Sequence, residues 1–412
     1  MSERTKISRN SRVLYILCIA FCLASGRLYG SSPQVTGGFA FAVAVGFNSS
    51  TECYTYLIAP DASFGKSPPT LATLPADITW LYGAPNGRAV YAISIGGDYL
   101  LQYKVDASGN LLPARHAKLA VPKPAGINFN PYRDLAYVFT DDGRLLAYDI
   151  GHNGELSRDD DLDIRPPPFT SPVTIAYSPG GKFMYVLYVY SNTAPMNHVG
   201  CIKAYLSLRT GHPKEVQLAD IFNHIGAYPM DLIADGRGPY LYAFKGSGID
   251  TYKIADGGGL DLIAKTVSSE GNTQTVDAVE GVRHFFIGLW QNVGNMNSAS
   301  NGIVIAMRKS DGSVAPLYTY YADRNGDLSQ VMPTDNNNLA LFARLSYDVK
   351  SNILYALDVY NKKIYYYKLQ NDGRLVLLNT FALFGGQARA KSPELDELLM
   401  IPGKADDQSP QP

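Results

Sequence analysis

The sequence lacks several features that would place it in a common functional class. Its 36 Lys and Arg are balanced by 37 Asp and Glu, so it has no basic excess with which to neutralise a phosphate backbone. Nucleic acid is therefore not expected as a partner. No G-x-S-x-G, H-E-x-x-H or P-loop sequence occurs, so serine hydrolase, zinc protease and nucleotide-binding motifs are missing. No C-x-x-C occurs either, which excludes zinc-ribbon and thioredoxin chemistry.

A long apolar run of the length needed to cross a bilayer is also lacking. The uncharged segment 13–24 has twelve residues, and a helix of that length rises only about 18 Å. It follows a basic stretch and precedes small residues, which is the layout of a secretory signal. We predict a signal peptide over 1–26, cleaved after Gly26 or Gly30, and an exported protein that is periplasmic or extracellular. The alternatives are an uncleaved anchor or a wrongly assigned start.

Cysteine is scarce. Two of the four cysteines, Cys18 and Cys22, lie in the predicted signal, which leaves Cys53 and Cys201 in the mature chain. An exported protein can oxidise such a pair, but disulfide geometry is specific. The sequence leaves open a disulfide or two separated, part-buried thiols.

What the chain has in abundance is repeated strand patterns. One pattern is a polar turn followed by an apolar strand that contains Tyr or Phe, as in 85–93, 131–139, 179–187 and 235–244. A second pattern follows it: an aromatic strand, a turn with Gly, and a strand with Leu. The turn glycines are Gly65, Gly109, Gly154, Gly211, Gly258, Gly312 and Gly373. Their spacing gives seven units of about 51 residues, each with room for four strands, which differs from tetratricopeptide and leucine-rich repeats.

Seven units of four strands predict an all-β fold, a seven-bladed β-propeller with four-stranded antiparallel blades. The segment 39–45 matches a second strand without a first, and 394–404 matches a first strand without a second. We therefore expect the C-terminal strand to join the N-terminal blade and close the ring. This gives one propeller domain over 35–403, followed by a polar tail over 404–412 that we expect to be disordered.

The blade motifs resemble a known family. SPGGKFMYVLY (178–188), AYPMDLIADGRGPYLYAF (227–244) and NILYALDVYNKKIYYYKLQNDGRL (352–375) are similar to the YVTN-type, lactonase-like propellers of the 6-phosphogluconolactonase type. The resemblance spans nearly all of the mature chain, but it rests on blade-building residues. The His-Pro-His and Asp-Leu-Gly-x-Asp segments typical of the lactonases are missing; the nearest counterpart of the second is 357–361, which lacks the Gly. The resemblance therefore implies the fold and transfers no catalytic residue.

Three long connections are predicted to lie on one face of the propeller: 190–200, 291–302 and 322–338. Long loops in a compact domain are commonly functional. The polar residues expected to meet a ligand there, or in the neighbouring connection, are His198, His224, Asn292, Asn297 and Arg324. Solvated insertions and surface histidines are the alternative.

One segment has the oxygen spacing of a calcium loop. Asp323, Asn325, Asp327 and Ser329 stand at positions 1, 3, 5 and 7, where hard oxygen ligands are needed. Leu328 replaces the usual Gly and Thr334 the usual Glu, so calcium is a weak candidate. No other cofactor is expected, because two Trp cannot supply the stacking rings of a quinone-dependent propeller.

Two functions remain open, and whether the chain is an enzyme is left undecided. The first is an exported, monomeric binding module whose loop face takes a protein, peptide or carbohydrate ligand. The second is a lactonase-like hydrolase of a sugar or carboxylic acid lactone, in which Arg324 would stabilise the developing oxyanion.

Overall fold

The fold was analysed in a computed structural model of the chain. The residues it describes are 38–45, 51–58, 70–75, 78–84, 87–94, 97–106, 108–159, 163–168, 170–190, 200–207, 213–216, 229–245, 248–267, 273–281, 283–292, 299–331, 340, 342–349, 351–358, 361–383 and 394–402.

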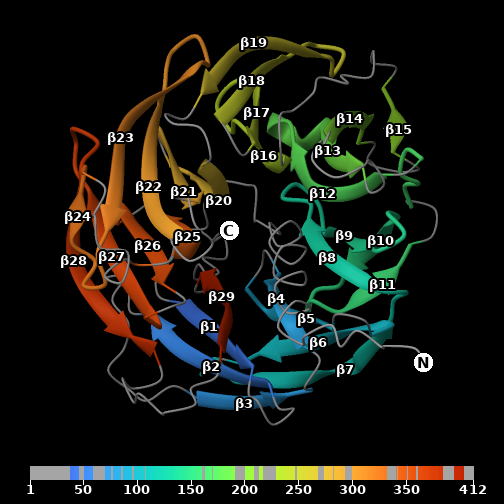
Figure 1. The fold of residues 1–412 in the computed structure, drawn as a ribbon. Helices are drawn as coiled ribbons and strands as arrows, with labels where there is room; N and C mark the ends of the chain where they lie inside the picture. The colour runs from blue at the N-terminus through green and yellow to red at the C-terminus, as the bar shows by residue number, and fades with distance from the viewer. Residues whose placement is uncertain are drawn as a thin grey trace, which may run out of the picture.

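The described residues form antiparallel β-sheets arranged in a ring (Figure 1), together with one 3-10 turn, Pro179–Gly181. Six of the sheets have four strands each, and the sheet formed by β20–β24 has five. This confirms an all-β propeller with four-stranded antiparallel blades. The prediction of seven four-stranded blades is wrong in its count, because six sheets fit that description and β24 adds a fifth strand to the remaining sheet.

The strand bounds follow the chain around the ring. The first three sheets contain β29 (Glu394–Pro402), β1 (Gly38–Val45), β2 (Thr51–Ile58) and β3 (Thr70–Leu74); β4 (Ile78–Gly83), β5 (Ala89–Ser94), β6 (Tyr99–Val105) and β7 (Leu111–Ala120); β8 (Pro124–Phe129), β9 (Leu135–Thr140), β10 (Leu145–Ile150) and β11 (Leu156–Arg158). The next two contain β12 (Thr170–Tyr177), β13 (Phe183–Tyr190), β14 (Gly200–Leu206) and β15 (Lys214–Glu215); β16 (Pro229–Ala234), β17 (Tyr240–Lys245), β18 (Gly248–Ile254) and β19 (Leu260–Val267). The last two contain β20 (Thr273–Glu280), β21 (His284–Asn292), β22 (Ala299–Arg308), β23 (Val314–Ala322) and β24 (Leu328–Ser329); β25 (Phe342–Asp348), β26 (Ile353–Asp358), β27 (Lys363–Leu369) and β28 (Leu375–Ala382).

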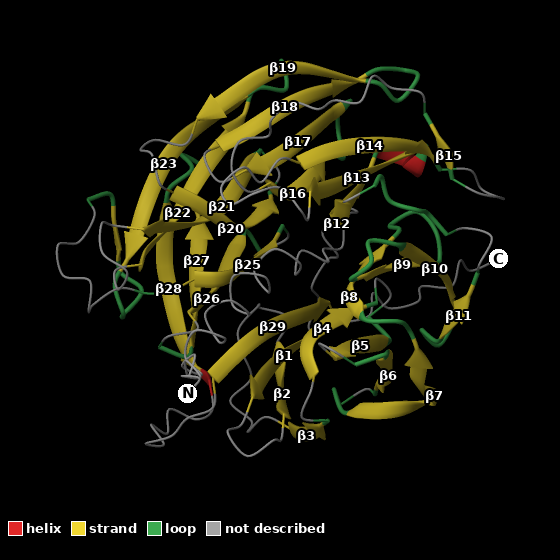
Figure 2. Cartoon of the chain, turned by 45° about the vertical axis from the view of Figure 1, so that its right-hand side comes forward, coloured by secondary structure: helices red, strands yellow, loops and turns green. Residues whose placement is uncertain are grey.

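The ring is closed by two strands from opposite ends of the sequence. β29 pairs antiparallel with β1, so that Phe39 lies opposite Ile401 and Val45 opposite Glu394. The predicted closure is therefore confirmed. The outer strands β3, β7, β19 and β23 lie at the periphery, and the first strand of each sheet lies nearer the centre (Figure 2).

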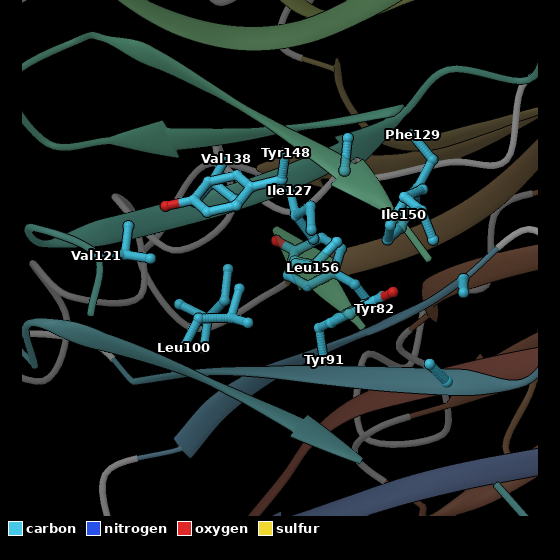
Figure 3. Close-up of a cluster of buried hydrophobic side chains, with 14 of the residues drawn as sticks. Tyr82, Tyr91, Leu100, Val121, Ile127, Phe129, Val138, Tyr148, Ile150 and Leu156 are labelled. Carbon is cyan, nitrogen blue, oxygen red and sulfur yellow. The ribbon is translucent and has the colours of Figure 1, made fainter. Parts of the chain in front are cut away.

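Side chains from neighbouring sheets meet in buried seams, and these seams form the core. Between the β4–β7 and β8–β11 blades, Tyr91, Leu100, Ile127 and Val138 are fully buried against one another (Figure 3). Burying an aliphatic or aromatic side chain of this kind stabilises the fold by about 1.5–3 kcal/mol. Successive side chains of a strand point to opposite seams: on β9, Ala136 and Val138 belong to this seam, and Leu135, Tyr137 and Phe139 to the seam with the next blade.

The turn between the third and fourth strands of a blade repeats with the same geometry. Its glycine has a φ of +79° to +87° and donates its N–H to the carbonyl oxygen three residues earlier. Residues other than Gly rarely adopt this φ, which explains the glycine repeat in the sequence. The turns with this geometry contain Gly109, Gly154, Gly258, Gly312 and Gly373.

Several of these turns each accept a hydrogen bond from a tyrosine of the preceding blade. The hydroxyl of Tyr91 donates to the Gly154 carbonyl at 2.6 Å, and that of Tyr185 to the Gly258 carbonyl at 3.2 Å. Tyr242 donates in the same way to Gly312 at 3.1 Å. We call this repeated contact the blade clamp. The contact explains why Tyr recurs in the sequence repeat, because a buried phenol hydroxyl needs a hydrogen-bond acceptor.

The two described cysteines do not pair. Cys53 on β2 and Cys201 on β14 are both buried and free. Burial raises the pKa of the Cys53 thiol to about 12, so this thiol stays protonated and unreactive.

Candidate functional site

The predicted ligand face is the end of the propeller from which the connections between second and third strands emerge. In an antiparallel blade this end also carries the connection that leaves the fourth strand. Of the predicted residues, His198, His224 and Asn297 lie outside the described part of the chain. Asn292 is the last residue of β21 and pairs with Ala299, so the strands extend further into the predicted loop 291–302 than expected.

Arg324 lies on this face, in a tight turn rather than in an open loop. The turn joins β23 to β24, whose residues Leu328 and Ser329 pair back onto Ala322 and Tyr321. We call residues 323–329 the edge hairpin. The first part of the predicted loop 322–338 is therefore ordered structure, a feature that the sequence interpretation missed.

The edge hairpin uses the same turn as the repeated blade turns. Gly326 has a φ of +90° and donates its N–H to the Asp323 carbonyl at 2.9 Å. The Asp323 carboxylate accepts the backbone N–H groups of Asn325 at 2.8 Å and Asp327 at 3.0 Å. The Asp106 carboxylate likewise accepts two backbone N–H groups in the turn between β6 and β7.

This likeness gives the suspected calcium spacing a structural reason. The oxygens of Asp323 accept hydrogen bonds within the turn, and the Ser329 hydroxyl accepts the backbone N–H of Val331 at 3.0 Å. Across the described ranges, no group of three or more His, Cys, Asp or Glu side chains is placed to hold a metal ion. Calcium binding by Asp323, Asn325, Asp327 and Ser329 stays an untested prediction.

The edge hairpin is held by side chains of the next blade. Lys363 Nζ donates to the Arg324 carbonyl at 2.9 Å, and the Tyr365 hydroxyl approaches the same oxygen at 2.8 Å. The Tyr367 hydroxyl donates to the Gly326 carbonyl at 3.0 Å. All three donors belong to β27, and the neighbouring edge strands β24 and β28 lie side by side at the rim (Figure 1). The backbone around Arg324 is therefore fixed from outside its own sheet.

Beneath this contact lies a buried carboxylate at the end of β26. Asp358 is fully buried, and its oxygens accept the Asn361 backbone N–H at 3.0 Å and the Asn361 side-chain amide at 2.6 Å. The Tyr365 hydroxyl lies 3.0 Å from Asp358 Oδ2. Burial, and then the nearby Asp358 charge, raise the pKa of Tyr365, so its phenol remains a hydrogen-bond donor. This Asp belongs to segment 357–361, the counterpart of the lactonase motif, and here it organises a turn.

The Arg324 side chain itself is exposed. Among the described residues its guanidinium has no hydrogen-bond or ion-pair partner, whereas its carbonyl has two donors. An anchored backbone with an unoccupied, permanently charged planar group is suited to binding a carboxylate or a phosphate.

A second polar cluster, missed at the sequence level, lies at the opposite end of the molecule. Arg308, at the end of β22, forms ion pairs with Asp235 of the preceding blade and with Glu280, the latter at 2.5 Å. The Arg308 and Asp235 side chains are only 9% and 3% exposed, and Glu280 is 27% exposed. Aligning the repeats could have revealed it, because the position of Arg308 is apolar in four other blades. Those equivalents are Val105, Ile150, Ile254 and Leu369.

Comparisons with known proteins bear on the fold. No protein-family model matches the sequence, and no curated protein matches it. A structure from Lactobacillus plantarum has a TM-score of 0.61 at 12% identity, covering 89% of this chain and 99% of that one. A candidate 6-phosphogluconolactonase from Bacteroides uniformis has a TM-score of 0.61 at 14% identity, covering 88% and 99%. The periplasmic gluconolactonase of Pseudomonas aeruginosa has a TM-score of 0.56 at 12% identity, covering 88% and 99%.

These likenesses establish that the chain has the propeller fold found in lactonase-like proteins. At such identities they carry no information about activity, since one fold serves many functions. The part of the chain that the structure describes contains no helix that could span a lipid bilayer.

Proposed function

We propose that this protein is an exported β-propeller that binds a ligand carrying a carboxylate or a phosphate at the face where Arg324 lies. In this ring the five-stranded β20–β24 sheet takes the place of one blade, with β24 as an added edge strand. The signal-like segment 1–26 supports export. The ligand is expected to be carbohydrate-like or peptide-like, and the propeller to act as a monomer.

The observation that carries this proposal is the anchoring of Arg324. Its backbone is fixed by Lys363 and by the β27 tyrosines, while its guanidinium is exposed and without a partner among the described residues. An arginine on a flexible loop must be ordered when it binds a ligand, and this costs conformational entropy. Here the backbone at Arg324 is already ordered in the folded protein. Ligand binding therefore does not incur the entropic cost of ordering it, which favours binding.

The test compares an acidic probe with its neutral counterpart. We expect the protein to bind D-gluconate more tightly than D-glucitol in calorimetric titrations, and Arg324→Ala to weaken gluconate binding by roughly 10-fold to 100-fold, the range expected for a bidentate charged hydrogen bond. Arg374→Ala is the matched control, because Arg374 is an exposed arginine in the turn between β27 and β28 at the opposite end. Equal binding of both probes, or gluconate affinity unchanged in Arg324→Ala, contradicts the proposal.

A second function is lactone hydrolysis, and one observation favours it. The Bacteroides uniformis and Pseudomonas aeruginosa neighbours are named as a candidate 6-phosphogluconolactonase and a gluconolactonase. Attack on a lactone carbonyl places negative charge on its oxygen, and ring opening yields a carboxylate. A guanidinium stabilises both. Arg324 would therefore serve this reaction in the same position.

The hydrolase proposal also needs a group that activates water. His152 lies in the turn after β10, and His284 begins β21, so both stand at the opposite end of their blades from Arg324. A base other than these two would be required. Opening of D-glucono-1,5-lactone, followed in a pH-stat, tests this function: we expect a rate above that of buffer that falls at least tenfold in Arg324→Ala. A rate equal to that of buffer excludes this lactone as the substrate.

A further inference from the structure

The edge hairpin contacts β27 side chains that the blade repeat itself does not require. In β27, Tyr365 pairs with Ala356, the residue after Tyr355. At the same position of the β4–β7 and β8–β11 blades, the residues after the repeated Tyr pair with Leu101 and Leu146. The fold therefore accepts an apolar side chain at this place.

Placing a tyrosine at this position costs desolvation free energy, which hydrogen bonding to the edge hairpin offsets. A buried phenol next to a buried carboxylate must find hydrogen-bond partners or pay for desolvation. Tyr365 meets Asp358 on one side and the Arg324 carbonyl on the other. One hydroxyl hydrogen serves one acceptor at a time, and Lys363 donates to the Arg324 carbonyl when Tyr365 turns to Asp358. The receiving residues and the hairpin thus satisfy each other.

Glycine at position 326 completes the fit. A Cβ atom at Gly326 would overlap the ring of Tyr365, and the φ of +90° disfavours any other residue. The Thr380 hydroxyl adds a longer contact of 3.4 Å to the Asn325 carbonyl. Three successive carbonyl groups of the turn, those of residues 324, 325 and 326, therefore each face a donor from the next blade.

We propose that Lys363, Tyr365 and Tyr367 are positioning residues that hold the edge hairpin so that Arg324 selects anionic over neutral ligands. This inference rests on the proposed function and adds the residues that determine its specificity. The three side chains act through the backbone of residues 324–326 and do not themselves contact the ligand. Loosening the hairpin returns Arg324 to a mobile chain, and binding an anion then requires ordering it again.

The experiment uses the full chain and removes donors without removing bulk. Lys363→Met and Tyr367→Phe are combined, and amide hydrogen exchange of residues 323–331 is measured together with affinity for D-gluconate and D-glucitol. We expect exchange in the hairpin to rise more than tenfold and gluconate affinity to fall about fivefold to tenfold, with glucitol affinity unchanged. Lys363→Arg, paired with native Tyr367, keeps the donor and should restore both properties.

Tyr185→Phe is the matched control. It removes the same kind of hydrogen bond, from a buried Tyr to a Gly carbonyl, in the seam between the β12–β15 and β16–β19 blades. It should lower stability without changing hairpin exchange or gluconate affinity. If the double variant does not fold, Tyr367→Phe alone carries the test.

The outcomes separate this inference from the proposed function. Gluconate binding that is lost in Arg324→Ala but native in the double variant overturns the positioning role alone. Hairpin exchange that stays native in the double variant overturns it as well. Gluconate binding that is absent from the native protein, or insensitive to Arg324→Ala, overturns the proposed function and the ligand selectivity together, while the exchange measurement still decides whether these residues hold the hairpin.

Discussion

The two ends of the propeller use the same contact for different purposes. At one end, Tyr91, Tyr185 and Tyr242 each donate to a turn glycine of the following blade. At the other end, Tyr367 donates to Gly326 of the preceding sheet, so the direction is reversed. The first contact recurs around the ring, and the second belongs to the edge hairpin.

Contacts that recur at several seams can be distinguished from a contact that serves one site. A contact present at several seams stabilises those blade boundaries and is explained by assembly of the ring. A contact made at one seam, to the turn of an added strand that the other sheets lack in the part of the chain that the structure describes, is not required for assembly. The blade clamp therefore stabilises the fold, whereas the edge hairpin positions Arg324.

The largest expected effect comes from opening the ring on which both contacts depend. Deleting residues 394–412 removes β29 and exposes the edge of β1, its partner. We expect loss of the cooperative thermal transition and of solubility, because unpaired edge strands aggregate. The deletion is compared with one of residues 405–412, beyond β29. A truncated chain that melts like the full chain would contradict closure by β29.

The next effect distinguishes the two kinds of glycine turn. A Cβ atom at Gly312 would overlap the Tyr240 ring, and one at Gly326 would overlap the Tyr365 ring, both at positive φ. We expect Gly312→Ala to lower the free energy of unfolding by about 2–4 kcal/mol, because it disrupts a blade clamp. Gly326→Ala should cost about 1–2 kcal/mol, because a short edge strand can detach while the ring stays closed. Urea denaturation of both variants measures the difference.

That pair also reports on binding. Gly326→Ala is expected to weaken gluconate binding, and Gly312→Ala to leave it intact under conditions where both variants are folded. Equal losses of stability in the two variants would show that the edge hairpin is as important for the fold as a blade turn, and would contradict the distinction between them.

The smallest effect concerns the charged cluster at the end that carries the blade clamps. Burial raises the pKa of Glu280 above its ordinary value, although Arg308 acts in the opposite direction. The folded protein then binds a proton more readily than the unfolded chain, so Glu280 makes stability fall as pH rises from the unfolded pKa of about 4.5 through the raised folded pKa. Glu280→Gln should flatten the melting temperature over this window, as followed by thermal unfolding at a series of pH values. A shallower loss of stability at low pH in the variant than in the native protein would show that the ion pair outweighs burial.

The sequence was informative where a residue recurs for a physical reason. The turn glycines predicted five described turns because their positive φ excludes most other residues, and the Tyr of the repeat marked the strand that bears the blade clamp. The closing strand was found because an incomplete pattern at each end of the chain completes one sheet.

The site was less accessible to this reasoning because it departs from the repeat. The segment 323–329 was interpreted as an open loop with a calcium spacing, although Asp323 and Gly326 are spaced like Asp106 and Gly109 in a blade turn. The added strand β24 was missed because two residues carry no periodicity. The contact between Arg324 and β27 could not be foreseen, since it depends on how neighbouring sheets meet in space.

The pairing of β1 with β29 also sets the order in which the molecule can form. These strands lie at the two ends of the described chain, so bringing them together requires closing a loop of nearly the whole sequence, at an entropic cost of roughly 5 kcal/mol. Blades made of adjacent strands pay far less and can form first. Closure is then the step with the highest contact order, and we expect it to be the slow phase of refolding. Until that step, the edges of β1 and β29 are both open, and the half-formed ring is most exposed to pairing with another chain.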